Sequence, residues 1–63
     1  MKYKIVVERY DKIVRQIIPY ITREFDIWDD AIEELGKLYL CFGAYYPIRF
    51  YEKTSEHGFK RIS

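Results

Sequence analysis

The chain contains only one cysteine and one histidine in 63 residues, which excludes two common ways of stabilising a small protein. A single cysteine excludes a disulfide within the chain. One cysteine and one histidine are also too few for a closed structural zinc site. A chain of this length buries only about 60% of the surface that it exposes when unfolded. We therefore expect self-association, or docking on a larger partner, to supply the missing stability.

Long apolar runs and a strong net charge are also missing. No stretch approaches the ~20 apolar residues that span a membrane. Residues 1–4 lead into an alternating pattern rather than into the apolar run of a signal peptide. The formal net charge of +1 gives no general argument for binding to nucleic acid. With the lone cysteine, which fits a reducing compartment, these features predict a cytoplasmic protein that does not engage membranes.

Motifs that carry chemistry are absent as well. The chain has no phosphate-binding loop and no dinucleotide fingerprint. His57 lies in an expected turn without a second histidine near it, and Cys41 has no evident activating base. Asp29, Asp30 and Glu33 could share one side of a helix, but they lack the spacing of a calcium loop. We expect no catalytic residue, no metal and no cofactor, and therefore no enzyme.

The clearest element is an amphipathic helix over Asp26–Gly43. Its apolar residues fall within an arc of about 140° at the helical period. They are Ile27, Trp28, Ala31, Ile32, Leu35, Leu38, Tyr39 and Phe42. Asp26 is the expected N-cap, and Gly43 is the expected left-handed residue after the last turn. Gly36 costs about 1 kcal/mol relative to alanine in a helix interior, and Leu40 and Cys41 break the pattern by pointing toward the polar side.

Residues 2–10 alternate apolar and polar side chains and are rich in β-branched and aromatic types, which is typical of a half-buried strand. A tight turn is expected at residues 10–12. Residues 13–25 fit two interpretations. Isoleucines recur at helical spacing, but Pro19 would cost about 3 kcal/mol or more inside a helix and is tolerated at a strand edge or bulge. A strand bent near Pro19 is the preferred interpretation.

The remaining segments complete the order β-β-α-β-β. Residues 48–53 and 59–62 read as strands, and residues 54–58 have turn chemistry. This order predicts an α+β fold in which residues 1–63 form a single two-layer domain, with one helix on a mainly antiparallel sheet. The expected helix-covered face consists of Tyr3, Ile5, Val7, Ile17, Ile21, Ile48, Phe50 and Ile62.

One helix covers only one face of a sheet, so the other face is expected to stay open. It would carry Val6, Tyr10, Val14, Ile18, Tyr20 and Tyr51, surrounded by Lys2, Lys4, Arg49 and Lys53. A face this apolar commonly marks an interaction site. Twelve aromatic residues, seven of them tyrosine, exceed what a core with one helix needs, and tyrosine is enriched at interfaces.

The charges are segregated along the chain. Residues 24–34 hold six acids and no base, whereas the rest holds eleven Lys and Arg against four acids, a net charge of +7. One explanation needs no function: the acidic helix face and the basic sheet face are simply exposed to solvent. The functional alternative is an electrostatically steered contact, including one in which the acidic face of one molecule meets the basic face of another.

These observations favour a small non-enzymatic protein-interaction module that is dimeric or bound to a protein partner. The expected interface comprises Val6, Tyr10, Ile18, Tyr20, Arg49 and Tyr51 on the sheet, with Leu40 and Cys41 on the helix. The alternative is a nucleic-acid-binding regulator that uses the basic, tyrosine-rich sheet face. In size and in its Lys-, Ile-, Tyr- and Glu-rich composition, the chain resembles small phage and mobile-element proteins of AT-rich bacteria. That resemblance implies binding to, and blocking of, a host protein complex.

Overall fold

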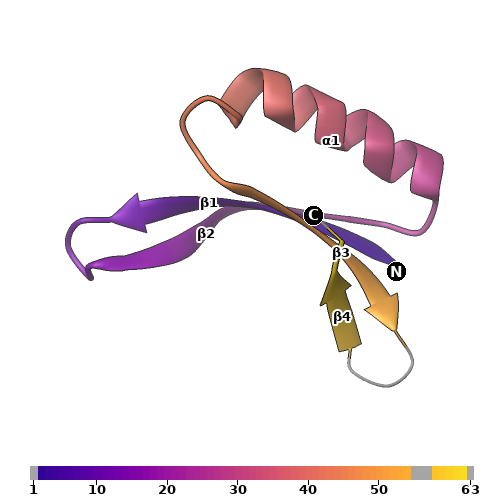
Figure 1. The fold of residues 1–63 in the computed structure, drawn as a ribbon, viewed down its shortest axis with the longest axis horizontal. Helices are drawn as coiled ribbons and strands as arrows, with labels where there is room; N and C mark the ends of the chain where they lie inside the picture. The colour runs from indigo at the N-terminus through magenta and orange to yellow at the C-terminus, as the bar shows by residue number, and fades with distance from the viewer. Residues whose placement is uncertain (1, 55–57, 63) are drawn as a thin grey trace.

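A computed structural model describes residues 2–54 and 58–62 and shows one helix packed on one face of a four-stranded sheet (Figure 1). The elements are β1 (Tyr3–Asp11), β2 (Gln16–Phe25), α1 (Trp28–Phe42), β3 (Ile48–Thr54) and β4 (Gly58–Arg61). The strands lie in the order β2-β1-β3-β4, and each neighbouring pair is antiparallel. The predicted α+β fold and its β-β-α-β-β order are confirmed.

The core lies where β1 and β3 pass beneath α1. Ile5 pairs with Phe50, and Val7 pairs with Ile48, so their side chains share the face below the helix. Ile5 and Val7 are 0% exposed. Ala31 and Leu38 of α1 are buried against them. The alternation predicted for residues 2–10 therefore places its apolar set in the core, as expected.

Strand β2 contains a bulge that the alternating pattern does not reveal. Val7 pairs with Ile21, but the next residue, Glu8, pairs with Pro19, so Tyr20 is an extra residue in β2. Glu8 donates its backbone N–H to the carbonyl of Pro47, on the β3 side of β1. The Glu8–Pro19 pair is therefore not joined by ladder hydrogen bonds. Pro19 consequently costs no ladder bond, and the preferred strand interpretation is confirmed.

The bulge changes which residues of β2 face the helix. Odd-numbered residues face the helix after the bulge in the chain, and even-numbered residues face it before the bulge. Ile21 faces the helix, as expected, and Phe25 lies on the same side. Beyond the bulge, Ile17 lies opposite Tyr10 on the open face, whereas Ile18 lies on the helix side. The predicted faces of Ile17, Ile18 and Tyr20 are therefore wrong. The reason is that an inserted residue shifts a two-residue period by one position.

Helix α1 begins and ends differently from the sequence prediction. Its N-cap is Ile27, with φ −113° and ψ 129° and no side-chain cap, so Asp26 lies one residue too early to be the N-cap. Gly43 has φ −59° rather than a left-handed conformation. A Cβ at Gly43 would lie 2.6 Å from the backbone oxygen of Tyr39. Close approach, not a positive φ, is therefore the reason that glycine fits this position.

Two groups of three aromatic rings flank the aliphatic core. Tyr3, Trp28 and Phe50 pack with ring centroids 5.4–6.2 Å apart. Tyr20, Phe42 and Tyr46 form the second group, with centroids 5.5–6.0 Å apart. These distances suit favourable aromatic pairs. Half of the twelve aromatic residues therefore have a structural role within the chain, which weakens the sequence-based inference from aromatic content.

The loop between β1 and β2 spans residues 12–15, later in the chain than the turn predicted at residues 10–12. The Asp11 carboxylate accepts hydrogen bonds from the backbone N–H groups of Ile13, at 2.8 Å, and Val14, at 3.3 Å. Arg15 closes the loop in a left-handed conformation with φ 58°. In the second predicted turn, Gly58 has φ 70°, whereas residues 55–57, including His57, lie outside the described residues.

Candidate interaction surfaces

The open face of the sheet is largely covered by its own charged side chains at the β3–β4 end. The Lys4 ammonium lies 4.3 Å from the ring centroid of Phe59 and 5.2 Å from that of Tyr51. These distances are within the range of cation–π attraction. Arg49 forms an ion pair with Glu8 at 3.1 Å across this face. Tyr51, Phe59 and Arg49 are all half-buried, so this part of the sheet presents little free apolar surface.

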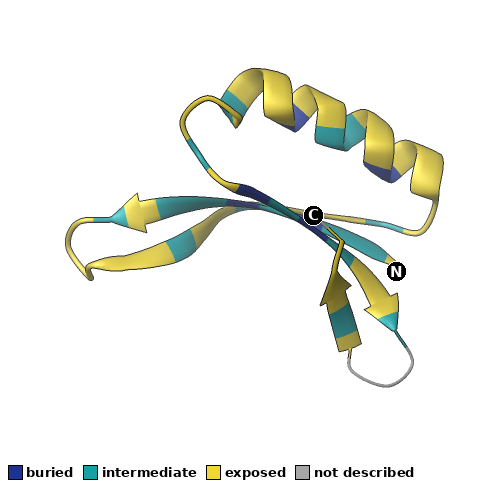
Figure 2. Cartoon of the chain, viewed as in Figure 1, coloured by how far each residue is buried: buried dark blue, intermediate teal, exposed yellow. Residues whose placement is uncertain are grey.

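The other end of the sheet is different, because the paired ends of β1 and β2 project beyond the helix (Figure 1). We call residues 10–17 the hairpin end. Its large apolar side chains are all exposed: Tyr10 57%, Ile13 92%, Val14 54% and Ile17 58%. Figure 2 shows the hairpin end as an almost continuously exposed segment, in contrast to the buried centre of the sheet.

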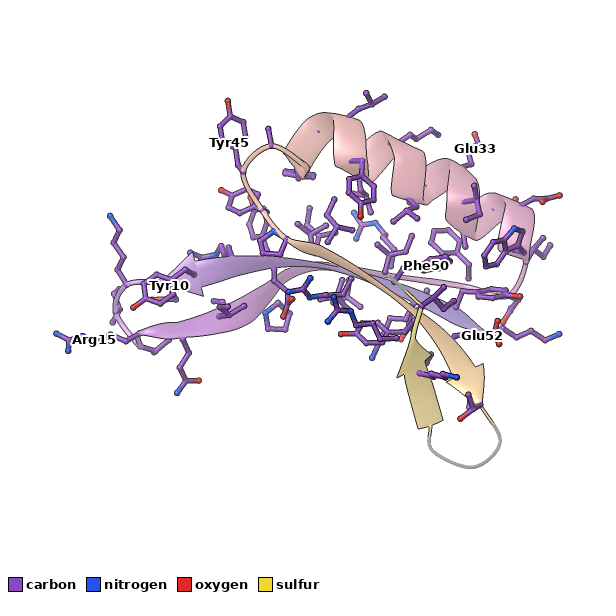
Figure 3. All side chains as sticks on the ribbon, viewed as in Figure 1. Tyr10, Arg15, Glu33, Tyr45, Phe50 and Glu52 are labelled. Atoms are coloured by element: carbon purple, nitrogen blue, oxygen red, sulfur yellow. The ribbon has the colours of Figure 1, made fainter. Side chains whose placement is uncertain are left out.

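Basic side chains accompany these apolar residues. Lys12 and Arg15 flank Ile13 and Val14 in the loop, and within the described residues neither cation forms an ion pair. Figure 3 shows Arg15 extending from the tip, away from the rest of the molecule. Asp11 is engaged with the loop backbone and lies 3.6 Å from Arg9. The hairpin end is therefore an apolar surface with free positive charge.

A second exposed apolar surface lies along α1. Ile32, Gly36, Tyr39 and Leu40 are neighbours at helical spacing along one exposed flank of the helix, and we call them the helix stripe. Ile32 is 40% exposed, Tyr39 is 47% exposed and Leu40 is 90% exposed. A Cβ at Gly36 would meet no atom within 4 Å. This glycine, which costs about 1 kcal/mol relative to alanine, therefore has no packing role within the chain.

Acidic side chains border the helix stripe. Asp29 and Glu33 occupy neighbouring helical positions, and both are exposed. Glu33 points away from the sheet in Figure 3 and forms the expected pair with Lys37 at 3.5 Å. Both side chains of that pair are about two-thirds exposed, at 69% and 65%, so the pair contributes little to stability. Glu33 is therefore available for other contacts.

The eight residues predicted as an interface lie on three different surfaces. By register, the open face carries Val6, Tyr10, Arg49 and Tyr51. Ile18 and Tyr20 lie on the helix side, where Tyr20 contacts Phe42 and Tyr46. Leu40 and Cys41 are exposed on α1, in the other layer, as the helical wheel predicts. Whether any of them contacts a partner stays a prediction.

Sequence reasoning missed the exposure of Ile13 and Ile17, whereas Leu40, which is 90% exposed, was among the predicted interface residues. Ile13 and Ile17 were assigned to a strand and to the covered face, and Gly36 was treated only as a cost to the helix. Asp11 was the available signal for the hairpin end, because aspartate often caps a turn through its own side chain. Recognising that turn moves Ile13 out of the strand and onto the tip.

The described part of the chain forms no side-chain cluster suited to a metal ion. Across residues 2–54 and 58–62, no three or more His, Cys, Asp or Glu side chains lie close enough to hold a metal ion. The described residues also include no helix that could cross a membrane. Comparison with protein-family models, curated proteins and solved structures gave no match to the chain.

Proposed function

We propose that this chain is a non-enzymatic, cytoplasmic protein-binding module whose main contact surface is the hairpin end. The observation that supports this function is the exposure of Tyr10, Ile13, Val14 and Ile17 together on one projecting element. Clustered apolar exposure, rather than single exposed apolar residues, is what marks an interaction site. The contact surface therefore shifts from the predicted centre of the open face to its projecting end.

The loop geometry favours binding because it holds the tip in one conformation before contact. The two hydrogen bonds from the loop backbone to Asp11 fix residues 12–15 relative to the strands. A contact segment that is already ordered loses less conformational entropy on binding. Ile13 and Val14 are thus presented as fixed apolar anchors between two long cations, a combination that suits a partner with an apolar groove and an acidic rim.

A blocking role is one form of this function. A protein that inhibits a host complex by occupying a surface acts stoichiometrically and needs a contact surface but no catalytic group. The compositional resemblance to small phage and mobile-element proteins adds this role to the proposed function.

Affinity capture with matched variants tests the proposed function. The tagged wild-type chain, the Ile13→Ser/Val14→Ser variant and a Tyr45→Ser control would be exposed to lysate of the source cells, with retained proteins identified by mass spectrometry. Tyr45 is a suitable control because it is 82% exposed and lies outside the hairpin end. We expect specific proteins to be retained by wild type and control but lost with the double variant. An identical set of proteins on all three chains would contradict this function.

A nucleic-acid-binding regulator is the second candidate, because four cations share the open face by register. They are Lys4, Arg49, Lys53 and Arg61. However, the Lys4 ammonium lies over the rings of Tyr51 and Phe59, so these rings are less accessible for base stacking. Mobility-shift assays over a salt series, with wild type and a Lys53→Glu/Arg61→Glu variant, distinguish the two functions. Binding that weakens steeply with salt and is lost in the variant would favour nucleic acid.

A further inference from the structure

Gly36 is the feature of α1 that the isolated chain does not explain. The residue lies inside the helix, is exposed, and has open space where a Cβ would stand. Glycine weakens a helix at such a position, and no close packing against the chain's own atoms requires it. The absence of a side chain does, however, create a notch on the outside of the helix.

Exposed apolar side chains surround this notch. Ile32 lies one turn before Gly36, and Tyr39 and Leu40 lie one turn after it, so all three are its neighbours on the helix surface. Each is at least 40% exposed. A small aliphatic side chain that enters the notch would contact apolar groups on both sides, because glycine lets another chain approach the helix backbone closely.

The charges around the notch are opposite to those at the hairpin end. Asp29 and Glu33 border the helix stripe, and Lys12 and Arg15 border Ile13 and Val14. The hairpin end therefore combines apolar groups with two cations that are unpaired within the described residues, and the helix stripe combines them with two acids, of which Glu33 also pairs with Lys37 at 3.5 Å. Figure 1 shows the hairpin end pointing away from α1, so the two surfaces of one molecule do not meet each other.

We propose that the chain associates with a second copy of itself, with the hairpin end of one copy docked on the helix stripe of the other. Ile13 or Val14 enters the notch at Gly36, while Lys12 and Arg15 face Asp29 and Glu33. This inference rests on the proposed function and identifies one protein partner of the same hairpin end. The contact joins two different surfaces, and is therefore heterologous.

Charge reversal with complementation tests the pairing directly. One variant carries Lys12→Glu/Arg15→Glu, and the other carries Asp29→Lys/Glu33→Lys. Each variant alone places like charges on both surfaces, so we expect its self-association to weaken at least about tenfold relative to wild type. A mixture of the two variants restores opposite charges at both kinds of contact. We therefore expect the mixture, but neither variant alone, to recover the wild-type mass in size-exclusion chromatography with light scattering.

A substitution that fills the notch separates association from folding. Gly36→Gln introduces a better helix former, so the variant should unfold at a higher temperature than wild type. The same side chain occupies the notch, so self-association should weaken at least about tenfold, which is a shift that light scattering over a concentration series resolves. Cys41→Gln is the matched control, because Cys41 is exposed on α1 about 140° around the helix from Gly36. The control should associate like wild type.

Three results would overturn this inference. They are a wild-type chain that is monomeric up to about 1 mM, a mixture of charge variants that fails to recover association, and a Gly36→Gln variant that associates as wild type does. A monomeric wild type whose captured proteins still depend on Ile13 and Val14 would leave the proposed function standing. If instead the chain self-associates as expected but captures the same proteins with and without the Ile13→Ser/Val14→Ser change, the proposed function is rejected.

Discussion

The covered centre of the sheet and the hairpin end contain the same kinds of residue but have opposite environments. Ile5 and Val7 are 0% exposed beneath α1, whereas Ile13 is 92% exposed and Val14 is 54% exposed. Helix length explains the difference. At 15 residues, α1 is about 22 Å long, and the longest dimension of the molecule is 35 Å. Apolar composition alone therefore does not predict where the core lies. The β-branched residues that become buried are those that α1 covers.

The largest expected effect comes from Phe50→Ala at the covered centre. Phe50 is 2% exposed and contacts both Tyr3 and Trp28. Removing its ring should lower the free energy of unfolding by about 3–5 kcal/mol, measured by chemical denaturation followed by circular dichroism. A loss below about 1 kcal/mol, typical of surface positions, would mean that the centre of the sheet is not the core.

Gly43→Ala should have the next largest effect, at the end of the helix that covers the sheet. The new Cβ would lie 2.6 Å from the Tyr39 carbonyl oxygen, so the backbone must shift. We expect a loss of about 1–3 kcal/mol in the free energy of unfolding. Gly36→Ala is the control. It should stabilise the chain by about 1 kcal/mol, so two substitutions of the same type should act in opposite directions.

A smaller effect is expected from Asp11→Ala at the hairpin end. The substitution removes the acceptor for the backbone N–H groups of Ile13 and Val14. The loop is exposed, so water replaces the carboxylate, and the loss should be about 1 kcal/mol. Asp11→Asn keeps an oxygen acceptor and should retain most of the stability. Equal losses in both variants would show that the acceptor does not hold the loop.

The smallest effect on stability is expected from Ile13→Ser at the tip. Ile13 is 92% exposed, so the free energy of unfolding of the monomer should change by less than about 0.5 kcal/mol. This should be measured at low protein concentration, because self-association would add a contribution of its own. A loss comparable to that of Phe50→Ala would mean that Ile13 is buried within the chain and is not a contact residue.

Much of the fold follows from local patterns. The two-residue period of residues 2–10 and the helical period of Asp26–Gly43 each report burial on one side of one element. Pro19 correctly favoured a strand over a helix. The order β-β-α-β-β then limits the architecture to one helix on one sheet.

The parts that the sequence did not predict depend on contacts between elements. Pro19 indicated an irregularity in β2, but the extra residue at Tyr20 exists only relative to β1, so the faces of Ile17 and Ile18 could not be assigned correctly. Gly43 looked like a left-handed residue because glycine often is one, but the reason here is the nearby Tyr39 carbonyl. The exposure of the hairpin end was also not predicted, because helix length relative to the sheet determines which apolar residues stay uncovered.

Pro19 also restricts how the long outer strand can be extended. β2 is an edge strand of ten residues, and such an edge invites uncontrolled pairing with strands of other chains. Since the Glu8–Pro19 pair has no ladder bond, the Pro19 nitrogen faces the free edge, where it offers no N–H. A strand added along β2 would therefore lose a hydrogen bond at Pro19, next to the bulge at Tyr20. The chain can expose an apolar tip while its longest edge resists fibre-like growth.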